Sequence, residues 1–536
     1  MNHPASTPPL PEARAPVSAT ILAAWLGLGA MAVVVAVAPS PLFDLDRFTV
    51  AKELALNLVA LVAFGILAAS GREPTSLVAT EVPLFGFAGW SALSALFATN
   101  RWLSLRALAV TVAGVVIFRA GRRVTARGAG RVLHIGLAAA VVVAALGGLV
   151  QAYGGDISLL AGARAPGGTF GNRNFLAHLL AIGAPLLLLL VVEARDAHRA
   201  TLGALCLGLL SGAVVLTRSR AAWLAWAASF LVMALAWLWA RRRHPALAPA
   251  GRWRLLGTAL AAGAAAALVL PNRLDWRSAS PYRDTMLDLT NYRQGSGHGR
   301  LIQYRNTLHL AELDPVFGTG PGNWPVKYPL VTTPGDPSFA GFDSMPTNPW
   351  PSSDWVAVVA ERGAVAALLL LATFLAMGLT ALLRLRGEEA EESRRAVALL
   401  GVLTATLVTG AFDAVLLLAP PTFLVWSSAG LLLPATGTAA TLSRGARRRL
   451  VPLLLVFGFA AVTRSAGQLA AILITGPGWP VARLERAVRF DPGSYRLHLM
   501  IAQRTGCMTA RAHARAAARL FPTLPAPKRR LAACGN

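Results

Sequence analysis

The sequence predicts an all-α polytopic membrane protein with about twelve or thirteen transmembrane helices, a large loop on one side and a small helical C-terminal tail. Of its 536 residues, 55% are hydrophobic and only 14% are charged, whereas a soluble domain carries about 25% charged residues. The apolar residues come in runs long enough to cross a bilayer as helices. Arginines gather in alternate connecting loops, which is typical of chains that cross the membrane many times.

The candidate spans follow one another closely along the chain. At about 20 residues per span, we place them near 18–38, 51–69, 80–98, 102–119, 132–152, 175–193, 199–216, 221–240, 253–270, 355–383, 396–418, 421–441 and 450–474. The preceding segment, 1–17, is rich in proline and nearly uncharged. It lacks the basic start and the cleavage site of a signal peptide, so we expect the first helix to be retained.

The formal net charge of +25 does not indicate a nucleic-acid-binding protein. Such a protein needs a basic domain with interleaved aromatic residues, whereas these arginines sit in short loops between apolar runs. The three cysteines, Cys206, Cys507 and Cys534, are too few for a disulfide framework and lack the spacing of zinc ligands. We therefore expect no metal site and no nucleic-acid partner.

The positions of the arginines also predict which loops lie on which side of the membrane. Counted from the N-terminus, the even-numbered loops hold Arg119, Arg122, Arg123, Arg127 and Arg131; Arg241, Arg242, Arg243, Arg252 and Arg254; Arg384, Arg386, Arg394 and Arg395; and Arg444, Arg447, Arg448 and Arg449. The positive-inside rule places these loops and the N-terminal segment 1–17 in the cytoplasm. Within the transmembrane domain, 18–474, the long loop at about 271–354 then lies outside. The tail, 475–536, lies outside too if the number of spans is odd.

The long outer loop is the least membrane-like part of the transmembrane domain. Apolar residues have helical spacing from Arg300 to Leu313, and a run of turn signals follows, DPVFGTGPGNW. Such residues could simply shape a connector. Loops of this length are uncommon unless they are functional or disordered, and aromatic residues throughout this one argue against disorder. We predict that the loop is functional.

The tail changes character again. It reads as a helix, an Asp-Pro turn, a second helix and a further helix, and AVRFDP resembles the end of a tetratricopeptide repeat. One and a half repeats are too few for a free solenoid, so we expect the tail to pack on the outer loop or on a partner. In an oxidising compartment Cys507 and Cys534 would pair, and Cys206 would stay reduced.

Polar residues stand at two outer helix ends. Arg218 and Arg220 could snorkel to the interface, but two outer arginines also suit a bound anion, because guanidinium holds phosphate bidentately. In GGTFGNRNF, Asn172 and Asn174 can cap a helix whose N-terminus favours an anion, and Arg173 adds charge. A plain N-cap with an interfacial arginine is the alternative. We favour anion binding.

Four motifs in series resemble the O-antigen ligase and O-antigen polymerase superfamily: GTFGNRNFLAH, TRSRAAWLAW, GRLIQYRNTLHLAELDPVFGTGPGNW and DWVAVVAERGAVAALLLL. The resemblance covers roughly 160–380. It implies a multi-pass glycosyltransferase of the bacterial inner membrane that works on the periplasmic side. The donor would be a glycan on undecaprenyl pyrophosphate, and the acceptor would be lipid A-core, a polysaccharide or a protein hydroxyl. No metal, cofactor or nucleotide sugar would be needed.

The resemblance also implies a site. Arg218 and Arg220 match the family's outer arginine pair, and Arg300 matches an arginine at the start of the loop helix. These three would cradle the pyrophosphate, whose developing charge needs fixed cations. We place Arg173, Asn172, Asn174 and Ser352 in the same substrate-binding group.

One departure concerns the base. The family usually has a His-Asn pair where this chain has Ser352 and Ser353, and a serine cannot act as a base at neutral pH. Asp354 is our first candidate for the base and His298, beside Arg300, is the second.

The sequence thus favours a ligase-type transferase embedded among membrane lipids and acting in lipopolysaccharide biosynthesis. The alternatives are an O-antigen or exopolysaccharide polymerase, a protein O-oligosaccharyltransferase, an inactive scaffold that keeps the lipid-pyrophosphate site, and a transporter. A transporter would show broken helices in matching positions of two halves, and no such halves correspond here.

Overall fold

The predicted fold class is confirmed by the computed structural model. It describes the chain except for residues 1–16, 40–45, 70–75, 79, 156, 161–163, 246, 248–249, 289–290, 292, 294, 334–335, 340–344, 347–348, 434–438, 442, 477 and 536. A helix stands at each of the thirteen predicted spans. Ten of these helices are long and apolar enough to cross a membrane, and the other three are α3, α9 and α15.

The helices of the bundle have the following bounds: α1 Val17–Val35, α2 Asp46–Ala69, α3 Val82–Ser94, α4 Arg101–Ala126, α5 Gly130–Ala152, α6 Arg173–Val192, α7 Ala197–Thr217, α8 Arg220–Arg241, α9 Ala250–Val269, α13 Asp354–Arg384, α14 Ala390–Phe412, α15 Ala419–Leu432 and α16 Arg444–Thr475. Between α9 and α13 lie α10 Pro281–Leu287, α11 Gly295–Leu313 and α12 Trp324–Lys327. Two short strands, β1 Ser76–Val78 and β2 Ala439–Thr441, pair antiparallel with Ser76 opposite Thr441.

Small residues let the helices approach closely, as expected where lipid gives no hydrophobic drive for association. A Cβ on Gly136 of α5 would lie 2.6 Å from the Cα of Gly27 in α1. A Cβ on Gly263 of α9 would overlap the carbonyl oxygen of Gly208 in α7. The α6 helix is buried around most of its circumference, so it stands in the middle of the bundle.

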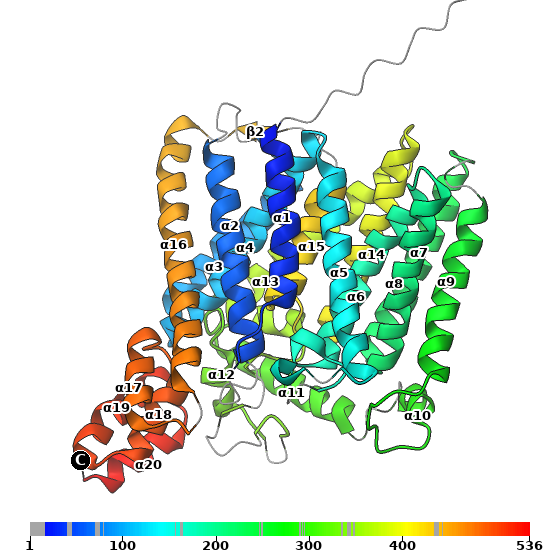
Figure 1. Ribbon diagram of the computed structural model, residues 1–536. Helices are drawn as coiled ribbons and strands as arrows, with labels where there is room; N and C mark the ends of the chain where they lie inside the picture. Colours follow the sequence, from blue (N-terminus) through cyan, green and yellow to red (C-terminus); the bar gives the residue numbers. More distant parts are fainter. Residues whose placement is uncertain are drawn as a thin grey trace, which may run out of the picture.

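The long loop and the tail lie at the same end of the bundle. Figure 1 shows α10, α11 and α12 at the lower end, with the tail beside them, while the start of α1 and strand β2 lie at the upper end. This arrangement agrees with an odd number of spans between the N-terminal segment and the tail.

The turn run of the loop docks on a kink in α13. Gly363 has a φ of 78° within that helix, and a Cβ there would overlap the carbonyl oxygen of Val316. The Glu361 carboxylate accepts hydrogen bonds from the backbone N–H of Gly322 at 2.8 Å and of Trp324 at 3.2 Å. The glycines in DPVFGTGPGNW therefore serve close packing between the loop and α13.

The tail forms four helices, α17 Val481–Phe490, α18 Tyr495–Arg504, α19 Cys507–Leu520 and α20 Pro525–Ala533. It packs on the outer loop, because Tyr495 and Phe521 cluster with Val326 of α12, and the Thr523 hydroxyl donates to the Val326 carbonyl at 2.6 Å. The resemblance of the tail to a tetratricopeptide repeat stays a prediction.

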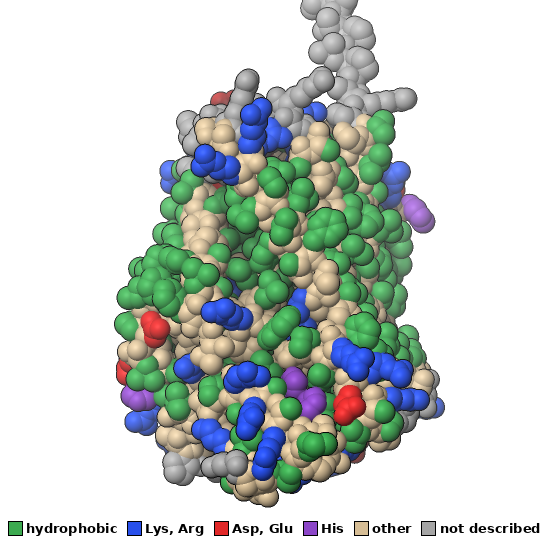
Figure 2. Space-filling view, turned by 90° about the vertical axis from the view of Figure 1, so that its left-hand side faces the viewer, with side chains coloured by type: hydrophobic (Ala, Val, Ile, Leu, Met, Phe, Trp, Pro, Cys, Tyr) green, Lys and Arg blue, Asp and Glu red, His purple; other side chains and the backbone are tan. Residues whose placement is uncertain are grey.

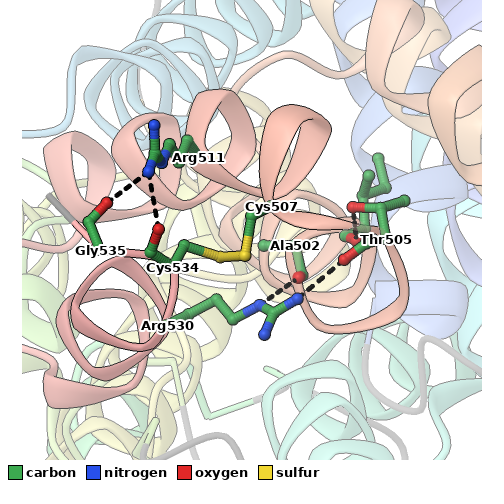
Figure 3. Close-up of a disulfide and its surroundings, with 8 residues drawn as sticks. Ala502, Thr505, Cys507, Arg511, Arg530, Cys534 and Gly535 are labelled. Carbon is green, nitrogen blue, oxygen red and sulfur yellow. Dashed lines mark hydrogen bonds between the residues drawn. A yellow bond between two sulfur atoms is a disulfide. The ribbon is translucent and has the colours of Figure 1, made fainter.

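A disulfide joins the two ends of the α19–α20 hairpin (Figure 3). Cys507 and Cys534 are bonded, with their Cα atoms 5.3 Å apart, and Cys206 is free, as the sequence predicted. Two guanidinium groups secure the same region: Arg511 donates to the carbonyls of Cys534 and Gly535, each at 2.6 Å, and Arg530 donates to the carbonyl of Ala502 at 2.8 Å.

Candidate functional site

A polar cavity of about 580 Å³ lies at the lower end of the bundle. Helices α6 and α8 begin at it, α7 and α14 end at it, and residues of α10 and α11 cover it. Seven of the nine residues predicted for the site line this cavity: Asn172, Arg173, Asn174, Arg218, Arg220, Arg300 and Ser352. The structure therefore brings together residues that lie up to 180 positions apart in the sequence.

Two of the arginines share one aromatic ring. The guanidinium carbon of Arg173 lies 4.6 Å from the centroid of Trp276, and that of Arg218 lies 4.8 Å from it. Arg218 is the C-cap of α7 with a left-handed φ of 52°, and its Nε donates to the Thr285 hydroxyl at 2.7 Å. A ring face attracts a cation, so Trp276 holds two like charges close together at the cavity.

Arg220 ties the outer loop to the bundle. It is the first residue of α8. Its guanidinium donates to the Asp288 carbonyl and, at 2.8 Å, to the Ser296 hydroxyl. Both acceptors belong to the α10–α11 region, which therefore closes over the arginines.

The opening of α6 has the cap that its sequence predicts. The Asn172 side chain accepts from the Asn174 backbone N–H at 2.9 Å, and Gly171 takes a left-handed φ of 68° just before it. The N-termini of α6 and α8 both meet the cavity, and a helix N-terminus favours negative charge. Capping and anion binding are thus compatible in this loop.

Arg300 and Asp413 both line the cavity and carry opposite charges. Arg300 makes no hydrogen bond or ion pair of its own with any residue that the structure describes, so its guanidinium remains available to a ligand. Asp413 follows α14 and its carboxylate accepts from the Ala414 N–H at 2.9 Å. Burial raises the pKa of Asp413 to about 6, and the charge of Arg300 opposes that rise.

The balance of charge suits an anion. Five arginines line the cavity, counting Arg164 with the four predicted ones, against two aspartates, Asp288 and Asp413. Arginines that are already held by Thr285, Ser296 and Trp276 lose little freedom when a ligand binds. The arrangement can therefore hold a multiply charged phosphate group in a fixed orientation.

The two residues predicted as the base do not line the cavity. Asp354 is fully buried, and its carboxylate accepts from the backbone N–H of Val415 at 3.0 Å and of Leu416 at 2.9 Å. These bonds link the start of α13 to the turn after α14 and engage both carboxylate oxygens of Asp354. His298 is exposed on α11, outside the lining. The geometry places neither residue in the lining of the cavity, and a role as the base stays a prediction for both.

Ser352 is held by the loop helix. Its backbone N–H donates to Gln303 at 2.6 Å, and its carbonyl accepts from the Tyr304 hydroxyl at 2.7 Å. Gln303 also donates to the Ser338 hydroxyl at 3.1 Å. The wall of the cavity on this side is thus a hydrogen-bonded set that includes Ser352.

Sequence reasoning missed Asp413, Arg164, Gln303 and Trp276. Asp413 carried a usable signal, since it is an isolated carboxylate in the apolar predicted span 396–418, and such residues are functional candidates by default. The other three carried no such signal, because only the folded chain places Arg164, Gln303 and Trp276 beside the predicted residues. Among the described residues, no group of three or more His, Cys, Asp or Glu side chains could hold a metal ion.

The similarity to known proteins lies in the outer loop and the helices around it. No curated protein matches the chain. Residues 204–371, from α7 into α13, match the family model described as O-antigen ligase. That match includes Arg218, Arg220, Arg300 and Ser352 and confirms, over this part of the chain, that the protein resembles the O-antigen ligase superfamily.

Proposed function

We propose that this protein is a glycosyltransferase of the O-antigen ligase type. It moves a glycan from undecaprenyl pyrophosphate to an acceptor hydroxyl on the periplasmic side of the bacterial inner membrane, with its N-terminus in the cytoplasm. The observation that supports this most is the single cavity that gathers five arginines and one buried aspartate, three of the arginines coming from the segment that matches the family.

The arginines would bind the donor through its pyrophosphate. Arg218 at the end of α7, Arg220 at the start of α8 and Arg300 within α11 line one space, so they can contact both phosphates from different sides. The N-termini of α6 and α8 add partial positive charge in the same direction. As the sugar–oxygen bond breaks, the leaving pyrophosphate gains charge, and fixed cations stabilise that charge most.

Asp413 would take the role that the sequence assigned to Asp354 or His298. The acceptor oxygen attacks the anomeric carbon of the glycan and forms the new glycosidic bond. The bond from that carbon to the pyrophosphate oxygen breaks, and the acceptor proton passes to the Asp413 carboxylate. A base with a pKa of about 6 is mostly ionised at neutral pH and accepts a proton more readily than an ordinary aspartate.

The orientation of the protein has independent support. The disulfide between Cys507 and Cys534 suits an oxidising compartment such as the periplasm. The tail that carries it lies at the same end of the bundle as the cavity (Figure 1). The arginine-rich loops lie at the opposite end, since α8 and α14 reach the cavity by their other ends.

The deciding experiment is a donor-release assay with the purified full-length protein. Undecaprenyl-pyrophosphate-linked oligosaccharide is incubated with lipid A-core, with a free polysaccharide or with a serine-containing peptide, and the released undecaprenyl pyrophosphate is measured. Release that depends on lipid A-core supports a ligase, and dependence on polysaccharide or peptide supports the polymerase or the protein transferase. Donor binding without release for any acceptor would leave the inactive scaffold as the answer.

A further inference from the structure

Helix α16 is longer than a membrane is thick. Its 32 residues extend about 48 Å at 1.5 Å per residue, whereas the hydrocarbon core of a bilayer is about 30 Å thick. Leu453, Val456 and Phe459 are exposed on it, Phe459 by 62%, and these form a lipid-facing wall. The remaining turns of α16 therefore project beyond the bilayer and carry the tail.

The first tail helix turns back along α16 towards the membrane. Asp491, just after α17, forms an ion pair of 3.0 Å with Arg464 of α16. A Cβ on Gly467 of α16 would lie 2.5 Å from the carbonyl oxygen of Phe490. Gly467 lies about 12 Å beyond Phe459 along the helix, at 1.5 Å per residue. The C-terminal end of α17 is thus the part of that helix nearest the lipid-facing wall (Figure 1).

This end of α17 combines two cations with an aromatic side chain. Arg486 and Arg489 are exposed, and Phe490 is 50% exposed. The two guanidinium groups have no hydrogen-bond or ion-pair partner among the residues described in the structure. Figure 2 shows several Lys and Arg side chains in the lower part of this face of the molecule, below a region of mainly hydrophobic and uncharged side chains.

The surrounding tail strengthens the positive potential at this edge. Residues 476–536 contain eleven Lys and Arg but only two acidic residues, Glu485 and Asp491, and Asp491 is already paired. Arginine with an adjacent aromatic side chain is typical of segments that lie at a membrane surface, and basic residues close to a bilayer attract anionic lipid headgroups.

We propose that Arg486, Arg489 and Phe490 form a contact site for anionic phospholipid headgroups in the leaflet on the cavity side. The arginines bind the headgroup phosphates, and Phe490 enters the interfacial region beside them. Through Val326 and Thr523 the tail is fixed to the outer loop, so this contact holds the loop at a constant height above the membrane. A soluble polyanion would instead use the distal cations, Lys528 and Arg529 of α20, equally well.

The test places a photo-crosslinking residue, p-benzoylphenylalanine, at position 490 of the full-length protein in nanodiscs. The matched control carries it at Met508, which is 92% exposed at the start of α19. With phosphatidylglycerol in the bilayer, position 490 should capture lipid about tenfold more than position 508. With phosphatidylcholine alone, capture at position 490 should fall by a similar factor.

Charge variants distinguish electrostatic attraction of anionic headgroups by the two arginines from simple closeness of position 490 to the bilayer. Arg486→Glu with Arg489→Glu should abolish the preference for phosphatidylglycerol, and the milder pair Arg486→Gln with Arg489→Gln should weaken it. The control, Lys528→Glu with Arg529→Glu, makes the same change in charge at the far end of the tail and should leave the preference intact. Equal capture at positions 490 and 508, equal capture of both lipids, or an equal effect of the distal pair would overturn the proposal.

Discussion

At the scale of single residues, the surroundings of each carboxylate decide what it can do. Asp354 and Asp413 are both buried at the lower end of the bundle, yet only Asp413 reaches the cavity. Both carboxylate oxygens of Asp354 accept hydrogen bonds from backbone N–H groups of the turn after α14. Asp354 therefore links α13 to that turn. Sequence position alone could not separate them, because the difference lies in which neighbours the folded turn supplies.

Replacing Asp413 by Asn should lower the transfer rate by about 10²–10⁴ if Asp413 is the base. Its folded-state pKa is raised to about 6, so the active, ionised form is lost as pH falls through 6 and is fully present well above it. The wild-type rate should rise with pH around that value and then level off. The measurement is the pH dependence of kcat/KM.

The same raised pKa gives a stability control. Because folding favours the neutral form of Asp413, its ionisation costs stability as pH rises from the ordinary aspartate value towards 6. Asp413→Asn should therefore fold at least as well as wild type at neutral pH, whereas Asp354→Asn should lower the Tm because it weakens two hydrogen bonds. An Asp413→Asn protein with unchanged kcat/KM would remove Asp413 from the mechanism.

The free guanidinium of Arg300 gives the sharpest test of anion binding. Arg300→Ala should reduce transfer by about 10²–10³, the usual cost of losing one fixed donor at a developing charge. Arg300→Lys should recover little, since an ammonium cannot make the paired contacts of a guanidinium. Arg305→Ala is the matched control, because Arg305 is exposed on the same helix and does not line the cavity. Equal activity of all three variants would show that transfer does not depend on Arg300.

At the scale of elements, the sequence predicted where the bundle helices lie in the chain. It did not predict which helix the outer loop packs on. Runs of apolar residues marked all thirteen bundle helices, because lipid demands them along the whole span. The turn signals of DPVFGTGPGNW predicted a bend but not its target, since Val316 and Gly322 contact Gly363 and Glu361 of α13, which lie about 40 residues further along the chain. The arginines converge because the ends of α6, α7, α8 and α14 meet at the cavity.

Gly363→Ala should test how much this docking matters. An alanine would have to adopt a φ of 78°, which costs about 1–2 kcal/mol, and its Cβ would overlap the Val316 carbonyl. We expect a lower Tm in detergent and a loss of transfer. Gly378→Ala on the same helix has open space around it and should be neutral or slightly stabilising. Two variants with the same Tm would mean that the kink can relax without the loop.

At the scale of the whole molecule, the cavity and the disulfide lie at one end of the bundle and the arginine-rich loops lie at the other. The start of α1 and the cavity lie at opposite ends of the bundle, with nine bundle helices between them in the chain. Some of those arginines also have structural partners, since the Glu81 carboxylate forms ion pairs with Arg119 at 2.5 Å and Arg122 at 2.9 Å. Which end faces the cytoplasm rests on the remaining excess of cations there.

Cysteine labelling in intact cells should decide the orientation. In a Cys206→Ala background that keeps the tail disulfide, Ser278→Cys and Ser443→Cys place one exposed thiol at each end of the bundle. A membrane-impermeant maleimide that has passed the outer membrane should label position 278 before lysis and position 443 only after it. The two changes are equally conservative, so a difference reports location and not folding. Labelling of position 443 alone in intact cells would reverse the topology, put the arginine cavity on the side without periplasmic acceptors, and so remove the basis for glycan transfer.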